Sequence, residues 1–251
     1  MVEAVSVTIL TKNSEKYLAE CLDALQAFDE VLILDNGSED ATLSIAGRYR
    51  NVTIVEHPFI GFGPMKNLAA QRARNDWIFS VDSDEIVTPQ LLDSIRSLDP
   101  NARNRVYSMN RLNHYRGKPV RCCGWYPDEV ARLYNRTHTR FSDAMVHESL
   151  VMEPDTRKEH LEGLIFHYPF DSAAALIEKM QRYSTLYARE HKSASSPAKA
   201  FWRASFSFLK NYLFRRGFLC GYEGLLISVS NANGVFYKYI KLYEKESEKR
   251  G

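Results

Sequence analysis

The sequence predicts an α/β fold: a mostly parallel, Rossmann-like sheet flanked by helices, with a helical C-terminal extension. Two observations predict it. Short apolar runs rich in β-branched residues alternate with amphipathic segments over the first 100 residues, as in parallel βαβ units. Long helical patterns then dominate from residue 172 onward. With 251 residues, 45% of them hydrophobic, the chain can form a packed core without disulfides or a structural metal.

The first 100 residues contain four segments with the pattern of buried strands. These are residues 5–10, 31–34, 52–55 and 77–81. Between them, residues 17–25 and 66–74 have helical spacing. Residues 35–40 predict a turn that caps the next helix, and residues 61–64, Gly-Phe-Gly-Pro, are expected to interrupt the chain.

The pattern becomes more antiparallel and irregular after residue 105. Strands are expected at 106–109, 131–134 and 165–168, followed by an amphipathic helix at 172–191. Residues 193–197 resemble a hinge, and helices are expected at 201–218 and 223–243. We therefore expect one domain over residues 1–192 and a helical extension over 193–251.

Charge is distributed unevenly along the chain. Residues 1–100 carry 8 Lys and Arg against 16 Asp and Glu, whereas residues 197–251 carry 10 against 4. An acidic first part suits a site for a divalent cation, and a basic last part suits an anionic surface such as a phospholipid leaflet or a phosphorylated glycan. A solvated charged face is an equally simple explanation. No nucleic-acid partner is expected.

The four cysteines, at positions 21, 122, 123 and 220, have no zinc-ligand spacing, and adjacent cysteines rarely bond each other. We expect reduced thiols in a cytoplasmic protein. The apolar run at residues 5–10 is too short for a signal peptide, and no segment approaches the roughly 18 apolar residues of a membrane span. Any membrane contact is therefore expected to be peripheral.

Polar residues follow three of the predicted strands. Thr11 and Asn13 follow the first, Asp35 and Asn36 the second, and residues 82–84 the fourth. In an open α/β sheet the carboxyl ends of parallel strands meet at the edge where ligands bind. The sequence therefore predicts a ligand site there.

Within this edge, Asp82 and Asp84 flank Ser83 on an extended segment, so both carboxylates face the same way. They can hold Mg²⁺ or Mn²⁺ and, through it, a diphosphate; an acidic helix N-cap is the alternative. Asp35 and Asn36 can bind a base or ribose, or form an ordinary turn. Lys66 can neutralise a phosphate, although a solvated lysine is the more common case.

Several motifs resemble those of the family 2 glycosyltransferases, which have the GT-A fold and invert the sugar's configuration. They are residues 7–13, 34–42, 61–67 and 80–85. Residues 124–128, 132–136, 140–143 and 146–148 are similar to the lipopolysaccharide inner-core β-1,4-glucosyltransferase subfamily. The resemblance covers residues 4–170 well and the tail loosely.

The resemblance implies a role for each matching residue. Thr11, Asn13, Asp35 and Asn36 would contact uridine, with Lys66 and Ser83 also on the donor side. Many family members have Asp where this chain has Asn36, which weakens the expectation of a base contact there. Asp82 and Asp84 would bind the metal, and His167 could add a later ligand or be a core histidine. Residues 1–100 would bind the nucleotide sugar, and residues 101–192 the acceptor.

Inversion needs one further carboxylate, because a base must remove the acceptor proton while the metal stabilises the leaving diphosphate. Glu148, Asp128 and Asp143 are the candidates. The resemblance ranks Glu148 first, and His147 beside it either tunes the base or is structural. Asp128 can equally be a turn residue.

The resemblance therefore implies transfer of glucose from UDP-glucose to a heptose of a lipopolysaccharide core. The protein would act in the cytoplasm, with peripheral contact to the inner face of the inner membrane through the basic aromatic helix at 201–218. That helix can equally pack its rings onto the catalytic domain. Rival hypotheses are a protein or another envelope glycan as acceptor, a nucleotide-sugar-binding protein without activity, and a membrane-surface scaffold.

Overall fold

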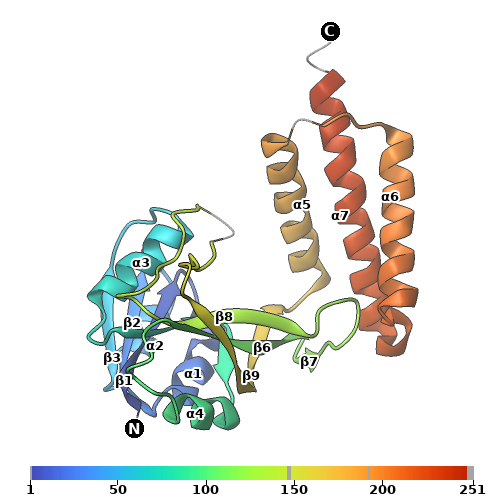
Figure 1. Ribbon diagram of the computed structural model, residues 1–251. Coiled ribbons are helices and arrows are strands. Elements are labelled where there is room, and N and C mark those ends of the chain that lie inside the picture. Colours follow the sequence, from blue (N-terminus) through green and yellow to red (C-terminus); the bar gives the residue numbers. More distant parts are fainter. Residues whose placement is uncertain (1, 146–147, 192, 248–251) are drawn as a thin grey trace. The chain divides into compact units, whose positions relative to one another are not determined.

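The computed structural model describes residues 2–145, 148–191 and 193–247 (Figure 1). Its contacts divide the chain into two compact units. The first comprises the described residues of 1–111 and 129–167, and the second those of 112–128 and 168–251. This division does not test the boundary expected between residues 192 and 193, which stays a prediction.

The first unit is built on a mixed sheet with helices packed against it (Figure 1). Its strands are β1 (Val2–Thr11), β2 (Phe28–Asp35), β3 (Val52–Glu56), β4 (Trp77–Asp82), β5 (Glu85–Val87), β6 (Arg105–Tyr115), β8 (Asp128–Asn135) and β9 (Arg157–Phe170). Its helices are α1 (Glu15–Ala24), α2 (Thr42–Ala46), α3 (Phe62–Arg72) and α4 (Pro89–Arg96). The ends of β6, β8 and β9 extend into the second unit's residues.

The strand order is β3-β2-β1-β4-β8-β6-β9-β5, and the short strand β7 (Lys118–Pro119) pairs with β6. β1 pairs in parallel with both β2 and β4, and β2 pairs in parallel with β3. β4 with β8 and β5 with β9 are antiparallel pairs. Parallel pairing through the first 82 residues and antiparallel pairing after them match the expectation from the sequence.

The central parallel strands β1, β2 and β4 are largely buried on both faces, as expected for a sheet covered by helices, whereas the outer strand β3 is partly exposed. Val7, Ile9, Ile33 and Phe79 are completely buried and pack with apolar side chains of α1. All four predicted strands lie within β1 to β4. The apolar runs identified them because a strand covered on both faces has no exposed positions to fill with polar residues.

The first turn of α3 corrects one local prediction. The break predicted at residues 61–64 is confined to Gly61, because α3 begins at Phe62 and contains Pro64 in its first turn. Proline is tolerated there because the first backbone N–H groups of a helix have no partner within it. Gly61, with φ of +111°, supplies the break one residue earlier.

The second unit contains three long helices, α5 (Ala173–Glu190), α6 (Pro197–Leu209) and α7 (Gly221–Ser247). Two short turns, η1 (Lys210–Phe214) and η2 (Gly217–Cys220), connect α6 to α7. The helix predicted at 201–218 therefore ends earlier: Arg216 has a left-handed φ of +55°. Among the described helices, none is long and apolar enough to cross a membrane.

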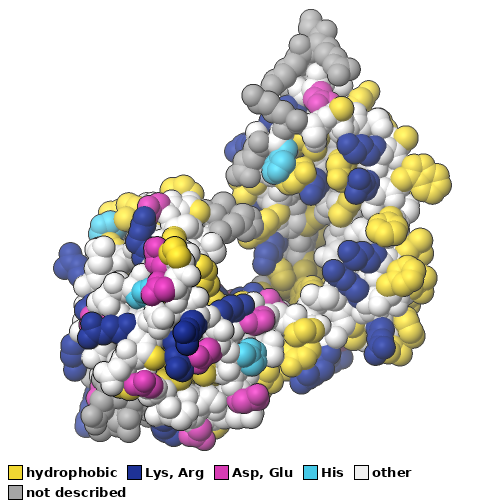
Figure 2. All heavy atoms as spheres, in the orientation of Figure 1, with side chains coloured by type: hydrophobic (Ala, Val, Ile, Leu, Met, Phe, Trp, Pro, Cys, Tyr) yellow, Lys and Arg dark blue, Asp and Glu magenta, His cyan; other side chains and the backbone are white. Residues whose placement is uncertain are grey.

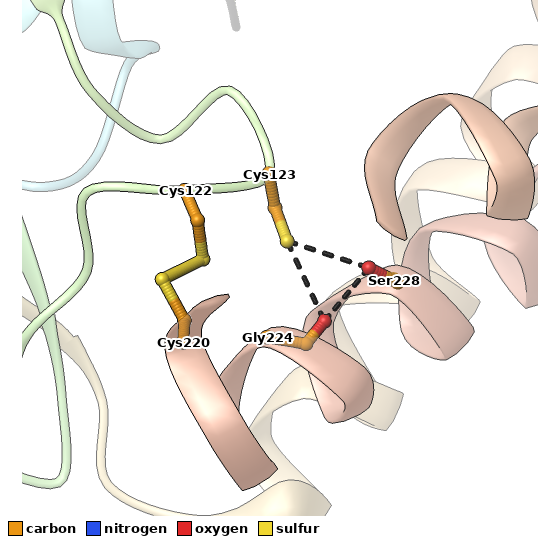
Figure 3. The surroundings of a disulfide bond; sticks show 5 residues. All are labelled: Cys122, Cys123, Cys220, Gly224 and Ser228. Carbon is orange, nitrogen blue, oxygen red and sulfur yellow. Dashed lines mark hydrogen bonds between the residues drawn. A yellow bond between two sulfur atoms is a disulfide. The ribbon is translucent and has the colours of Figure 1, made fainter. Parts of the chain in front are cut away.

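A disulfide within this unit joins Cys122 to Cys220 (Figure 3). The expectation of four reduced thiols is therefore wrong for these two, while Cys21 and Cys123 are free and buried. The bonded cysteines are 98 positions apart, and only the folded chain brings them together. Beside them, the Cys123 thiol lies 3.4 Å from the carbonyl oxygen of Gly224 and from the hydroxyl of Ser228.

Replacing Cys220 with Ser is expected to lower the free energy of unfolding by about 2–4 kcal/mol, because the disulfide restricts a long loop in the unfolded chain. Urea unfolding measures the loss. A reductant should cause the same loss in the wild type and none in the variant. Peptide mapping under non-reducing conditions that recovers both thiols free would contradict the bond.

Candidate functional site

Three strands bring the predicted polar residues to one edge of the sheet in the first unit. In the parallel registers, Thr11 of β1 lies opposite Asp35 of β2, and Leu10 lies opposite Asp82 of β4. The carboxyl ends of these strands therefore meet, as the sequence pattern predicted.

Asp35 organises the loop after β2. It is fully buried, and one carboxylate oxygen accepts hydrogen bonds from the hydroxyls of Thr11 (2.7 Å) and Ser38 (2.6 Å). The other accepts from the backbone N–H groups of Gly37 and Ser38, both at 2.8 Å. Burial raises the pKa of Asp35, but these hydrogen bonds outweigh it and lower the pKa below its usual value. Asp35 thus acts as a fixed negative charge that shapes the loop.

Asn13 links the loops after β1 and β2. Its backbone N–H donates to the Ser38 hydroxyl, and its side-chain oxygen accepts from the backbone N–H of Glu39, both at 2.9 Å. Asn36 is half-buried, and its backbone N–H donates to the carbonyl of Thr11 at 3.0 Å. The four residues expected around uridine therefore form one connected structure, while their contact with a base stays a prediction.

Asp82 lies in a network of buried charges. One of its carboxylate oxygens lies 2.5 Å from the guanidinium of Arg132 on β8. Arg132 also contacts the completely buried Glu85 at 3.1 Å, and Arg111 contacts the same Glu85 oxygen at 3.1 Å. The other Glu85 oxygen accepts the backbone N–H of Asp82 at 2.9 Å. The position of Asp82 is thus fixed through both its side chain and its backbone.

Sequence reasoning missed Glu85, Arg111 and Arg132 as parts of the site. Glu85 directly follows the Asp-Ser-Asp motif, so its position was a usable signal. Arg132 approaches Asp82 only because β8 pairs antiparallel with β4, which no local pattern encodes.

The side chain of Lys66, on α3, also reaches Asp82. Its side chain is buried, and its ammonium lies 3.0 Å from a carboxylate oxygen of Glu148 and 3.5 Å from Asp82. The alternative of a solvated lysine is therefore wrong. Burial raises the pKa of Asp82, but the positive charges of Arg132 and Lys66 outweigh it and hold that pKa well below its ordinary value.

Asp84 and His167 form a second pair at this edge. Their Oδ2 and Nε2 atoms are 3.5 Å apart, and β5 pairs with β9 so that Glu85 lies opposite His167. The Ser83 hydroxyl between the two aspartates donates to the Ser14 hydroxyl at 3.0 Å. Ser83 is therefore tied to the first turn of α1.

Whether these residues fit a divalent cation depends on the donor set. Within the described ranges, no group of three or more His, Cys, Asp or Glu side chains is arranged to hold a metal ion. Mg²⁺, however, is usually held by one or two carboxylates with water and substrate phosphates, rather than by a cage of protein ligands. Asp84 and His167 are close enough to share one cation. The Asp84 side chain is 34% exposed and that of His167 is 12% exposed, so further ligands would approach from the Asp84 side. A cation at Asp84 and His167, with its remaining ligands from a substrate, therefore stays a prediction.

The three candidate bases have different surroundings. Glu148 is mostly buried beside Lys66. Asp143 is exposed and pairs with Arg140 at 2.7 Å. Asp128 belongs to the second unit, where it accepts a hydrogen bond from Asn113 at 2.9 Å. Glu148 shares the Lys66 ammonium with Asp82, and His147 lies outside the described residues.

Comparison with known proteins agrees with this geometry. Residues 6–119 match the family model described as glycosyl transferase family 2. An uncharacterized glycosyltransferase of Rickettsia typhi is 28% identical and aligns with 98% of this chain and 89% of its own length. The lipopolysaccharide core biosynthesis glycosyltransferase LpsC of Rhizobium meliloti is 26% identical, over 97% of this chain and 93% of that protein.

The fold has a counterpart among solved structures. The mannosyltransferase PcManGT from Pyrobaculum calidifontis, solved in complex with GDP-Man and Mn²⁺, superimposes with a TM-score of 0.55. The match covers 97% of this chain and 88% of that chain at 14% identity, so it concerns the fold alone. The mixed α/β sheet and these similarities lead to one conclusion: the protein has the GT-A fold, and its residues 6–119 are similar to glycosyl transferase family 2.

Proposed function

We propose that the protein is an inverting, metal-dependent glycosyltransferase that moves glucose from UDP-glucose to a heptose of a lipopolysaccharide core. One observation carries the proposal. Asp82 and the proposed base Glu148 are both joined to the buried Lys66, at the sheet edge where α/β proteins bind their ligands. The name of the relative LpsC supports the acceptor class.

In this proposal each residue at the edge has one task. The loops held by Asp35 and Asn13 receive the nucleoside, and the ammonium of Lys66 attracts the diphosphate. Asp84 and His167, together with Asp82 two positions before Asp84, would hold the Mg²⁺ or Mn²⁺. The cation, when bound, stabilises the negative charge that develops on the leaving diphosphate.

Glu148 then serves as the base. Its Oε1 lies 3.0 Å from the Lys66 ammonium, so the ion pair orients the carboxylate. The acceptor hydroxyl loses its proton to this carboxylate as its oxygen attacks the anomeric carbon from the face opposite the diphosphate. Attack from that side inverts the configuration at the anomeric carbon.

The cytoplasmic location is also proposed. Disulfides are rare in reducing compartments, so the Cys122–Cys220 bond counts against this location. Fractionation of cells, with thiol trapping of the two cysteines at the time of lysis, tests location and redox state together.

A donor screen tests the nucleotide class. Thermal unfolding is measured with UDP-, GDP-, CMP- and dTDP-sugars, with and without Mn²⁺. Because a ligand that binds only the folded chain raises its stability, we expect a clear increase in Tm for UDP-glucose with Mn²⁺ and little without it. Stabilisation by a GDP-sugar alone would contradict the proposed donor.

Labelled UDP-glucose offered with heptose-terminated core oligosaccharide then tests the acceptor. Product with β configuration is expected. Transfer only to a protein or to another envelope glycan would preserve the chemistry but replace the acceptor. Donor binding with no transfer to any acceptor and no hydrolysis would indicate a nucleotide-sugar-binding protein.

A further inference from the structure

Helix α6 presents its large apolar side chains outward. Trp202, Phe206, Leu209 and Leu213 are spaced by four, three and four residues, so they form one stripe along α6 and the turn η1. Their exposed fractions are 70%, 62%, 45% and 49%. In a helix that only completes a bundle, such a stripe would be buried.

The opposite stripe explains the packing of α6 within its own unit. Ala200, Ala204, Ser207 and Asn211 have the same spacing, displaced by two residues or about 200° around the helix. Ala200 and Asn211 are buried and the other two are half-buried. The side of α6 turned into the unit is therefore lined by small and polar residues, and the apolar stripe is left for another partner.

The connection from α6 to α7 extends this surface. Phe214, Phe218, Leu219 and Tyr222 are exposed, Phe214 by 79%. We call these four residues and the outward stripe of α6 the apolar face. Figure 2 shows hydrophobic side chains interspersed with Lys and Arg on the helices of this unit.

The charge around the apolar face has one sign. Residues 197–222 contain five basic residues and no Asp or Glu. The five are Lys199, Arg203, Lys210, Arg215 and Arg216. Lys199 and Arg203 also lie over the ring of Tyr239 on α7, whereas Lys210, Arg215 and Arg216 are exposed near the connection.

The apolar face and the basic residues around it together favour some binding partners over others. A second copy of the chain placed symmetrically on the apolar face would bring two basic surfaces together, and like charges across an interface oppose binding. An anionic lipid leaflet offers the opposite charge together with an apolar interior. Aromatic rings and basic residues on one helix are the combination found in helices that lie in the membrane interface.

We propose that the apolar face docks the protein on an anionic phospholipid surface, with the rings of Trp202, Phe206 and Phe214 inserted at headgroup depth. This surface lies on α6, η1, η2 and the start of α7 and includes none of the residues assigned to sugar transfer. It therefore goes beyond the proposed function and does not depend on it. Since no described helix is suited to cross a bilayer, the protein would lie on the surface.

Trp202 is a built-in reporter for the test. Of the three tryptophans, Trp77 is buried and Trp125 half-buried, while Trp202 is largely exposed. The full-length chain is titrated with phosphatidylcholine vesicles containing or lacking phosphatidylglycerol, at low and high salt. Co-sedimentation and tryptophan fluorescence are recorded.

We expect binding at least ~10-fold stronger with phosphatidylglycerol, weakening with salt, and a blue shift that Trp202→Phe removes while binding persists. Phe206→Ser with Phe214→Ser should reduce binding by about 10-fold or more. Ile177→Ser, which changes an exposed apolar residue on α5, should leave it unchanged. Lys210→Gln with Arg216→Gln, which keeps every apolar side chain, should remove most of the phosphatidylglycerol preference.

Equal binding to both vesicle types, or no binding to either, would overturn the proposal. A protein that does not bind vesicles but forms concentration-dependent dimers would also overturn it, if Phe206→Ser with Phe214→Ser abolishes those dimers. The apolar face would then join two copies of the chain. UDP-sugar binding, measured on the same samples, reports on the proposed function separately.

Discussion

Glu148→Gln is expected to lower kcat for sugar transfer by about 100-fold or more, while UDP-sugar affinity changes little. The amide has nearly the shape of the carboxylate and can still contact Lys66, but it cannot accept the acceptor proton. Because Glu148 contacts Lys66 at 3.0 Å, calorimetry with UDP-glucose is used to measure donor affinity separately from the loss in rate.

Glu153→Gln is the matched control, because Glu153 is exposed in the same segment of the chain. It should keep wild-type activity. Wild-type turnover in Glu148→Gln would remove Glu148 as the base. A large loss in Asp143→Asn or Asp128→Asn instead would reassign that role.

Asp84→Ala is expected to weaken metal-dependent binding of a UDP-sugar by more than about 10-fold, since the loss of an outer partner of a metal ligand alone can cost that much. Calorimetric titration with UDP-glucose, in Mn²⁺ and in EDTA, measures the effect. Asp84 is a sharper test than Asp82. Removing Asp82 would leave the buried cations of Arg132 and Lys66 without one of their partners and destabilise the fold as well.

Asp93→Ala serves as the control, because Asp93 is an exposed aspartate paired with Arg96 on α4. It should bind the donor like the wild type. Unchanged affinity of Asp84→Ala at saturating Mn²⁺ would refute the assignment of Asp84 as a metal ligand.

The sequence predicted the parallel part of the fold well because its information is local. A strand buried on both faces favours a nearly continuous apolar run, and residues 31–34 show one directly. The common location of the polar groups at the strand ends was predictable for the same reason, because parallel strands place their carboxyl ends together. The registers Thr11 with Asp35 and Leu10 with Asp82 confirm this.

The antiparallel part of the fold and the remaining contacts of the candidate site depend on segments that are distant in the sequence. The pairing of β4 with β8 brings Arg132 to Asp82, and the pairing of β5 with β9 brings His167 to Asp84. Neither antiparallel register is encoded in a local pattern. The same reason hid the bond between Cys122 and Cys220, which are 98 positions apart.

The aromatic tail shows a different limit. Helical spacing identified an amphipathic segment at 201–218. Such a pattern does not show by itself which face of the helix packs against the rest of the protein. Only the folded unit shows that Ala200 and Asn211 face inward and that Trp202 and Phe206 face outward.

The central claim is that a cation held at Asp84 and His167 binds the donor diphosphate beside Asp82 and Lys66. A crystal of the protein with UDP-glucose and Mn²⁺, measured at a wavelength where manganese scatters anomalously, tests it most directly. We expect one strong anomalous peak within bonding distance of Asp84 and the diphosphate, with Glu148 near the anomeric carbon. A nucleotide bound elsewhere, or a manganese peak away from these side chains, would contradict it.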